Sequence, residues 1–160
     1  MNTKQIWHAL STNPITDSDF DGVFSSDLLE DIVVKPKLII CNTDPSYKEG
    51  KHWVLFYFDK STVEFYDSLG KSIKDYNSFV KFGKKYAIDF MESNCRTQPK
   101  NTAICGELCL YYSYYRCNGY NMEFILNKMQ NVNEVVEFVN KKFNICYDSK
   151  CKLLQYGVLL

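Results

Sequence analysis

Three strand-like runs in the first half of the chain do most to limit the folds that it can adopt. They are KLIICNT at 37–43, HWVLFYFD at 52–59 and TVEFYDS at 62–68, and each is rich in β-branched or aromatic residues. The segment DKST at 59–62 predicts a tight hairpin between the second and third runs. Because the apolar runs are nearly continuous, we expect both faces of the resulting sheet to be covered.

Helical patterns surround this predicted sheet. Apolar recurrence and capping residues predict helices at 4–10, 25–31, 71–91, 104–117, 122–129 and 132–143. Segment 16–22 resembles a loop, and a further strand is expected around 90–96. The pattern contains no repeat and no linker, so the expectation is an α+β protein with one domain over residues 1–160.

The charge balance limits the kinds of partner. The chain has 19 basic and 19 acidic residues, a formal net charge of +0, and this argues against a broad basic face for nucleic acid. A local basic patch around Lys81, Lys84 and Lys85 stays open as an alternative. Strong DNA binding is not expected.

Cysteine usage points to a reducing compartment. There are 7 cysteines, an odd number, and the first ten residues, MNTKQIWHAL, lack the long apolar stretch of a secretory signal. No run is long enough to span a membrane, so reduced thiols are the simplest interpretation. The spacings Cys105-x3-Cys109 and Cys146-x4-Cys151 are not those of zinc knuckles, and we expect no metal and no cofactor.

One cysteine lies where a nucleophile would be expected. In QPKNTAICGELC, residues 98–109, Cys105 is placed at the start of a buried apolar helix. The partial positive charge of a helix N-terminus stabilises a thiolate and lowers the pKa of its thiol. The competing interpretation is a structural cysteine, since free cysteine is often buried as a small hydrophobe.

Donors for an oxyanion are also present near Cys105. The backbone N–H of Cys105 has no acceptor within the first helical turn, and the amide of Gln98, on the preceding loop, is expected to swing back as a second donor. Gly106 carries no Cβ, so a substrate backbone is expected to approach there.

The chain offers only two histidines as a base. His8 lies in the amphipathic stretch IWHAL, where a structural or exposed role is favoured, whereas His52 begins the most apolar strand. Hairpin geometry brings the start of that strand beside the end of the next, where Asp67 is placed to orient the His52 ring. Alternatively, Asp67 forms only an Asx turn ahead of Gly70.

These motifs, taken in order, resemble a known protease family. His-Trp, Phe-Tyr-Asp-Ser-Leu-Gly and Gln-Pro-Lys-Asn-Thr-Ala-Ile-Cys-Gly are similar to the pattern of the adenovirus endoprotease family (adenain), which belongs with the SUMO-deconjugating peptidases to one larger group of cysteine peptidases. The resemblance covers about residues 20–120. It implies Cys105 as nucleophile, His52 as general base and acid, Asp67 as orienting acid and Gln98 as oxyanion donor. It also implies a central mixed sheet flanked by helices, one of which carries the nucleophile at its N-terminus.

The same resemblance implies a function. Adenain-like enzymes mature virus particles by cutting capsid and core precursor proteins, so the implied partners are viral capsid precursors, with an activating peptide as a further candidate. Such an enzyme would act in the host cytoplasm (virus factory) and in the virion. The short chain and its many Lys, Asn, Ile and Tyr residues, which are typical of an AT-rich coding sequence, favour a virophage or polinton-like source. Three departures separate it from adenain. Asp67 stands where adenain usually has Glu, and the chain is neutral where a protease that slides on DNA would be basic. Cys95 also lies nearer to Gln98 than the cysteine that holds the adenain peptide cofactor.

Three hypotheses remain at this level. The first is a viral maturation protease, and the second is a peptidase that removes ubiquitin-like proteins from host substrates. The third is a catalytically inactive relative that serves as a binding module. No role is assigned to the tail at 144–160.

Overall fold

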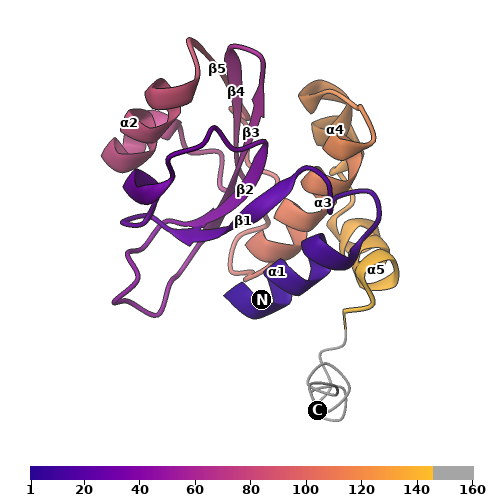
Figure 1. The fold of residues 1–160 in the computed structure, drawn as a ribbon. Coiled ribbons are helices and arrows are strands. Elements are labelled where there is room, and N and C mark those ends of the chain that lie inside the picture. The colour runs from indigo at the N-terminus through magenta and orange to yellow at the C-terminus, as the bar shows by residue number, and fades with distance from the viewer. Residues whose placement is uncertain (146–160) are drawn as a thin grey trace, which may run out of the picture.

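A five-stranded mixed sheet forms the centre of the molecule. The computed structural model describes residues 1–145. Its strands are β1 (Phe20–Ser25), β2 (Leu38–Asn42), β3 (Trp53–Asp59), β4 (Thr62–Asp67) and β5 (Asp89–Glu92). They lie side by side in chain order (Figure 1). The β2/β3 and β3/β4 pairs are antiparallel, whereas the outer pairs β1/β2 and β4/β5 are parallel.

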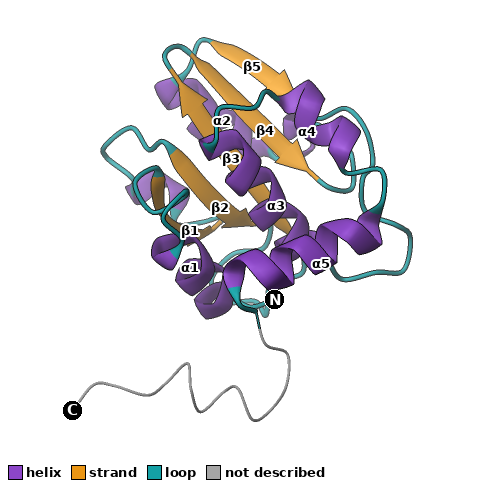
Figure 2. Cartoon of the chain, turned by 90° about the vertical axis from the view of Figure 1, so that its right-hand side faces the viewer, coloured by secondary structure: helices purple, strands orange, loops and turns teal. Residues whose placement is uncertain are grey.

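Helices cover both faces of this sheet. They are α1 (Thr3–Thr12), α2 (Asn77–Tyr86), α3 (Cys105–Cys117), α4 (Met122–Lys128) and α5 (Val132–Phe143), with short 3-10 turns η1 (Leu29–Asp31) and η2 (Ile73–Asp75). Figure 2 shows α1, α3, α4 and α5 in front of the strands, with α2 behind them. The expected coverage on both faces is present.

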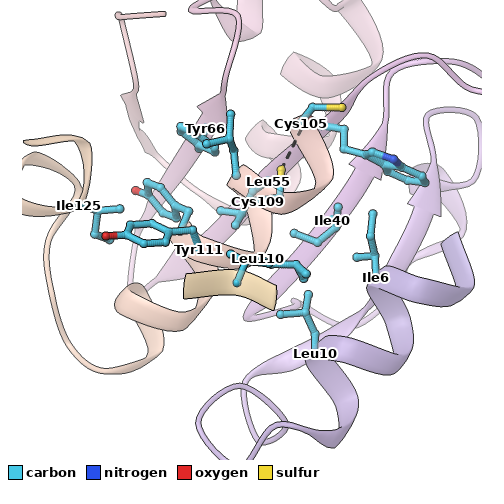
Figure 3. Packing of buried hydrophobic residues seen from close by; sticks show 14 of the residues in the cluster. Ile6, Leu10, Ile40, Leu55, Tyr66, Cys105, Cys109, Leu110, Tyr111 and Ile125 are labelled. Carbon is cyan, nitrogen blue, oxygen red and sulfur yellow. Dashed lines mark hydrogen bonds between the residues drawn. The ribbon is translucent and has the colours of Figure 1, made fainter. Parts of the chain in front are cut away.

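Each face has its own core because side chains alternate along the strands. On the α3 face, Leu55 and Tyr66 pack with α3 residues such as Leu110, and α1 contributes Ile6 and Leu10 (Figure 3). On the α2 face the core is rich in phenylalanine: the rings of Phe56, Phe58, Phe65, Phe79 and Phe82 contact one another. Helix α3 is thus held against the middle of the sheet by fully buried side chains.

The predicted single helix over 71–91 is wrong. That segment forms η2, then α2, then β5, and the two helical pieces are separated by Tyr76, whose backbone is extended (φ −130°, ψ 96°). The helix ends at Tyr86 because the chain turns into the sheet, where the N–H groups of Ile88 and Asp89 donate to the carbonyl of Ser61. Pairing with β4 overrides the local helical pattern. The strand expected around 90–96 is present as β5.

The predicted helix over 25–31 is also wrong. Only Leu29–Asp31 is helical, as one 3-10 turn, and residue 25 ends the edge strand β1. β1 begins inside the segment that the sequence presents as a loop, 16–22, and its parallel pairing with β2 contains an irregularity between Phe20 and Gly22. A short, partly exposed edge strand has no continuous apolar run that could reveal it.

The fold class is confirmed as α+β with a central mixed sheet. The expected strands at 37–43, 52–59 and 62–68 and the helices after residue 104 are present, with no end shifted by more than one residue. Within residues 1–145, none of the helices has the length and apolarity that crossing a bilayer requires. The assignment of one domain to residues 1–160 stays a prediction, and most of the 144–160 tail lies outside the described residues.

Candidate functional site

The four residues singled out by the sequence lie on segments that meet at one end of the strands, where β3 begins and β4 ends. His52 immediately precedes β3, and Asp67 is the last residue of β4. The register pairs Val54 with Asp67, so the hairpin brings the start of one strand beside the end of the other. Cys105 is the first residue of α3, and Gln98 lies on the loop between β5 and α3.

A short hydrogen bond joins the histidine to the acid. His52 Nε2 lies 2.7 Å from Asp67 Oδ1. A carboxylate only accepts hydrogen bonds, so Nε2 carries the proton and Nδ1 remains for the sulfur of Cys105. Asp67 Oδ1 also accepts from the N–H of Leu69 at 2.7 Å, and Oδ2 accepts from the Tyr76 hydroxyl at 2.9 Å. The Asx turn and the His-orienting contact are therefore made by the same carboxylate.

This environment favours the protonated imidazole. Burial of His52 disfavours the charged ring, but the hydrogen bond to Asp67 and the adjacent Cys105 outweigh it and raise the pKa of His52 to about 9. Asp67 is fully buried, so its charge acts on the ring with little screening by water.

The Cys105 thiol is shifted in the complementary direction. Burial of the thiol opposes ionisation, but the hydrogen bond with His52, the main-chain N–H of Trp53 and the α-amino group of Met1 together lower its pKa below the ordinary value. The N-terminal position on α3 acts in the same direction. Cys105 is 7% exposed and lies at the rim of the core cluster in Figure 3. The two shifts are complementary, because the environment favours the imidazolium of His52 and the thiolate of Cys105.

The other described cysteines lack this environment. Burial raises the pKa of Cys109 and of Cys41 well above that of an ordinary thiol. Cys109 lies one turn further along α3, and its sulfur donates to the carbonyl of Trp53 at 3.6 Å. Cys95 is exposed. Cys105 therefore differs from Cys109 both in its position at the start of α3 and in its contact with a histidine.

Gln98 is held at both ends of its amide and does not need to swing. Its Nε2 donates to the carbonyl of Thr102 at 2.6 Å, and its Oε1 accepts from the Ser68 hydroxyl at 2.8 Å. Gln98 is 5% exposed. A primary amide has two N–H donors, so the bond to Thr102 leaves the second N–H for another acceptor.

The segment Asp67–Gly70, which we call the acid turn, connects the acid to the glutamine loop. The carbonyl of Ser68 accepts from the N–H groups of Thr97 and Gln98 at 3.0 and 2.9 Å. Gly70 has φ +72°, and a Cβ there would come within 2.8 Å of backbone atoms of Cys95 and Arg96. Only glycine fits both the positive φ and this close approach.

The expectation for Gly106 is wrong in one respect. The position where a Cβ would project is occupied by the Met1 side chain, whose Cβ lies 3.0 Å away. The Met1 carbonyl accepts from the indole N–H of Trp53 at 3.1 Å, which fixes the first residue beside the start of α3. Gly106 thus permits close packing of the N-terminal segment, and in this structure that contact takes the space expected for a substrate backbone.

Other candidates from the sequence lie elsewhere. His8 is exposed on α1 and has no contact with the acid or the thiol. Two of the three lysines of the alternative basic patch make internal contacts: Lys81 pairs with Glu30 at 2.9 Å, and Lys85 donates to the carbonyl of Ile32 at 2.6 Å. No group of three His, Cys, Asp or Glu side chains within residues 1–145 could hold a metal ion.

Sequence reasoning missed two residues of this site. Ser68 directly follows Asp67 in the motif FYDSLG, so its proximity was available from the sequence although its contact with Gln98 was not. Tyr76 reaches Asp67 only because η2 and α2 are separate elements, and the single-helix prediction concealed this.

Comparisons with known proteins identify the fold. No protein-family model matches the sequence, and a comparison with curated protein sequences gives no match. The crystal structure of ASFV pS273R protease superposes with a TM-score of 0.64 at 17% identity, covering 91% of this chain and 67% of that one. SUMO protease Ulp1 gives a TM-score of 0.44 at 16% identity, covering 86% of this chain and 78% of that one. The chain therefore shares its fold with ASFV pS273R protease.

Proposed function

We propose that this protein is a cysteine endopeptidase. The observation that carries the proposal is the contact of His52 with Asp67 at 2.7 Å, together with a raised pKa at His52 and a lowered pKa at Cys105. A base with a raised pKa next to a thiol with a lowered pKa is typical of an activated nucleophile. The fold shared with a protease supports the same conclusion.

The arrangement assigns each residue a step in peptide hydrolysis. The Cys105 thiolate attacks the carbonyl carbon of the scissile bond, and the carbonyl electrons move to its oxygen. The backbone N–H of Cys105 and one N–H of Gln98 donate to that oxyanion. As the C–N bond breaks, the His52 imidazolium gives its proton to the leaving amine, and an acyl-enzyme remains.

The second half of the reaction returns the enzyme to its starting state. Neutral His52 takes a proton from water, whose oxygen attacks the acyl carbon, and the sulfur leaves as thiolate. Asp67 keeps the His52 ring in the orientation and tautomer that both halves require.

For the substrate, we propose capsid or core precursor proteins cut during virion maturation. Support comes from the adenain-like order of motifs around His52, Asp67 and Cys105, and from a shared fold with a protease of ASFV. On this proposal the source is a small DNA virus such as a virophage or polinton-like element, and the enzyme acts in the host cytoplasm and in the virion.

Co-expression with the capsid proteins of the same genome tests this proposal. Wild type and Cys105→Ala are compared by mass spectrometry of the precursors, with Cys95→Ala as a control that removes an exposed thiol. A fragment that forms with wild type and Cys95→Ala, and not with Cys105→Ala, is expected and identifies the cut site. Cleavage by Cys105→Ala at the wild-type rate would end the proposal.

The second candidate is removal of ubiquitin-like proteins from host substrates. The match to SUMO protease Ulp1 is too distant to carry it, but the same three catalytic groups would serve. An electrophilic probe that ends in a ubiquitin-like Gly-Gly sequence distinguishes the two. Labelling of Cys105 by this probe, without any cleavage of capsid precursors, favours the second candidate.

An inactive relative is the remaining alternative. It predicts that Cys105 reacts with a small alkylating reagent no faster than Cys95, whereas the proposed thiolate predicts faster reaction at neutral pH.

A further inference from the structure

We infer that Ser68 is a positioning residue that fixes which end of the Gln98 amide faces the oxyanion. This inference rests on the proposed function and deepens it. The Ser68 hydroxyl lies 2.8 Å from Gln98 Oε1, and Ser68 is fully buried.

The direction of this hydrogen bond follows from the partner at the other end. Gln98 Nε2 lies 2.6 Å from the carbonyl oxygen of Thr102, and a carbonyl accepts but cannot donate. The nitrogen must therefore face Thr102, which leaves the oxygen facing Ser68. A hydroxyl both donates and accepts, but opposite a carbonyl oxygen Ser68 must donate.

A flipped amide would be costly in this environment and useless for catalysis. It would place Oε1 against the Thr102 carbonyl, so that two acceptors face each other in a buried site. Toward the loop that leads into Cys105, a flipped amide would present an oxygen, which repels an oxyanion. The Ser68 donor raises the cost of that flip and keeps the N–H groups directed toward the loop.

The main chain of Ser68 supports the same position. Its carbonyl accepts from the N–H groups of Thr97 and Gln98 at 3.0 and 2.9 Å, so the backbone of Gln98 is anchored to the residue that anchors its side chain. Because Asp67 directly precedes Ser68, the acid and the oxyanion donor are set by adjacent residues of the acid turn.

The test compares Ser68→Ala with Gln98→Ala. Gln98→Ala should lower kcat by ~10²-fold, the scale for one oxyanion donor. Ser68→Ala should lower kcat about tenfold with KM nearly unchanged, because the amide is still present but less well oriented. In the Gln98→Ala background, Ser68→Ala should have no further effect, since its role passes entirely through the amide.

Ser113→Ala is the matched control. Ser113 is likewise fully buried and makes one side-chain hydrogen bond, to the carbonyl of Cys109 at 2.8 Å, but it does not contact the glutamine loop. Its kcat should equal the wild-type value. Thermal unfolding of each variant separates lost folding from lost orientation.

The outcomes distinguish this inference from the proposed function. If no cleavage depends on Cys105, the proposed function itself fails. If cleavage depends on Cys105 and Gln98 but Ser68→Ala has wild-type kcat, or lowers kcat equally in the Gln98→Ala background, the positioning role is overturned. Should Ser68→Ala not fold, Ser68→Cys replaces it: the thiol is a weaker donor, so an intermediate loss of kcat is expected, and wild-type kcat overturns the role.

Discussion

Two buried charged pairs lie along the same hairpin and the same helix, and only one of them is arranged for chemistry. At the open end of the β3–β4 hairpin, His52 contacts Asp67 beside the first residue of α3. Nearer the turn, Glu64 of β4 accepts from Arg116 of α3 at 3.0 Å. Each pair joins a residue of β4 to a residue of another segment, and the side chains of both pairs are largely removed from water.

The difference lies in what the positive partner can do. An arginine does not release its proton at any ordinary pH. Burial of Arg116 disfavours its charged form, but the contact with Glu64 outweighs burial and raises the pKa of Arg116 further. The hydroxyl of Tyr112 also donates to Glu64, at 2.9 Å. His52, whose pKa is raised to about 9, can gain and lose a proton within the ordinary pH range, and it lies beside the thiol of Cys105. The two pairs are alike in burial, and they differ because only the pair at His52 has a member that titrates beside a thiol.

Replacing the histidine at the open end should have the largest effect. His52→Ala should lower kcat/KM by ~10⁶-fold, the scale for losing a central member of a triad, because the base and the proton donor are both removed. His8→Ala, on the exposed side of α1, should retain wild-type kinetics. Steady-state kinetics on a peptide from the mapped cut site would make the comparison. The opposite ranking of the two variants would show that the wrong histidine had been assigned.

Neutralising the two carboxylates breaks the comparison directly. Asp67→Asn should lower kcat by ~10⁴-fold, because an amide does not stabilise the imidazolium or hold its tautomer. Glu64→Gln should leave kcat unchanged, although it weakens the contact with Arg116. Measuring kcat on the folded fraction of each variant separates the two effects. Equal losses of kcat in Asp67→Asn and Glu64→Gln would contradict a special role for the His52–Asp67 pair.

The pH dependence of activity should follow the first pair alone. Activity requires the thiolate and the imidazolium, so it should rise with pH through the lowered pKa of Cys105 and fall as His52 loses its proton, near a pKa of about 9. Beyond each limit, the rate should fall about tenfold per pH unit. Rates of Cys105 alkylation provide an independent measurement. A thiol that reacts only above its ordinary pKa of about 8.5 would refute the ion pair.

Removing the arginine should affect stability and not chemistry. Arg116→Met leaves Glu64 buried without its ion-pair partner, and the free energy of unfolding should fall by about 3–5 kcal/mol. The kcat of the folded enzyme should be unchanged. Denaturant unfolding measures the loss, and Arg116→Met combined with Glu64→Leu should recover part of it because no charge remains unpaired. A fall in kcat with little loss of stability would reverse the roles of the two pairs.

The parts of the site that are local in sequence were predictable. The hairpin places His52 beside Asp67 through strand register, and the apolar run after Cys105 predicts α3 with the cysteine at its start. The α+β class follows from the same patterns, because long apolar strands and helices carry strong periodic signals.

The parts that depend on distant contacts were not predictable. β1 is recognised only by its pairing with β2, and the break at Tyr76 arises where the chain returns to pair β5 with β4. The contact of Ser68 with Gln98 spans 30 positions and has no spacing rule. The packing of Met1 on Gly106 is likewise set by the docking of α1 on the core.

The close approach of the backbone at Gly70 separates two parts of the chain. One part has a length that the site constrains, and the other has a length that can change without moving the site. The acid turn and the loop at 95–98 are joined there by backbone contacts, so the stretch between them begins and ends at nearly the same point. Within it, Tyr76 still donates to Asp67. That intervening stretch contains α2, which lies on the face of the sheet away from α3, and the strand β5, which pairs with β4. Related chains could therefore gain or lose residues in its connecting loops while the distance between acid and glutamine stays constant. Diversity in length should accumulate there, and the spacing from Gln98 to Cys105 should not vary.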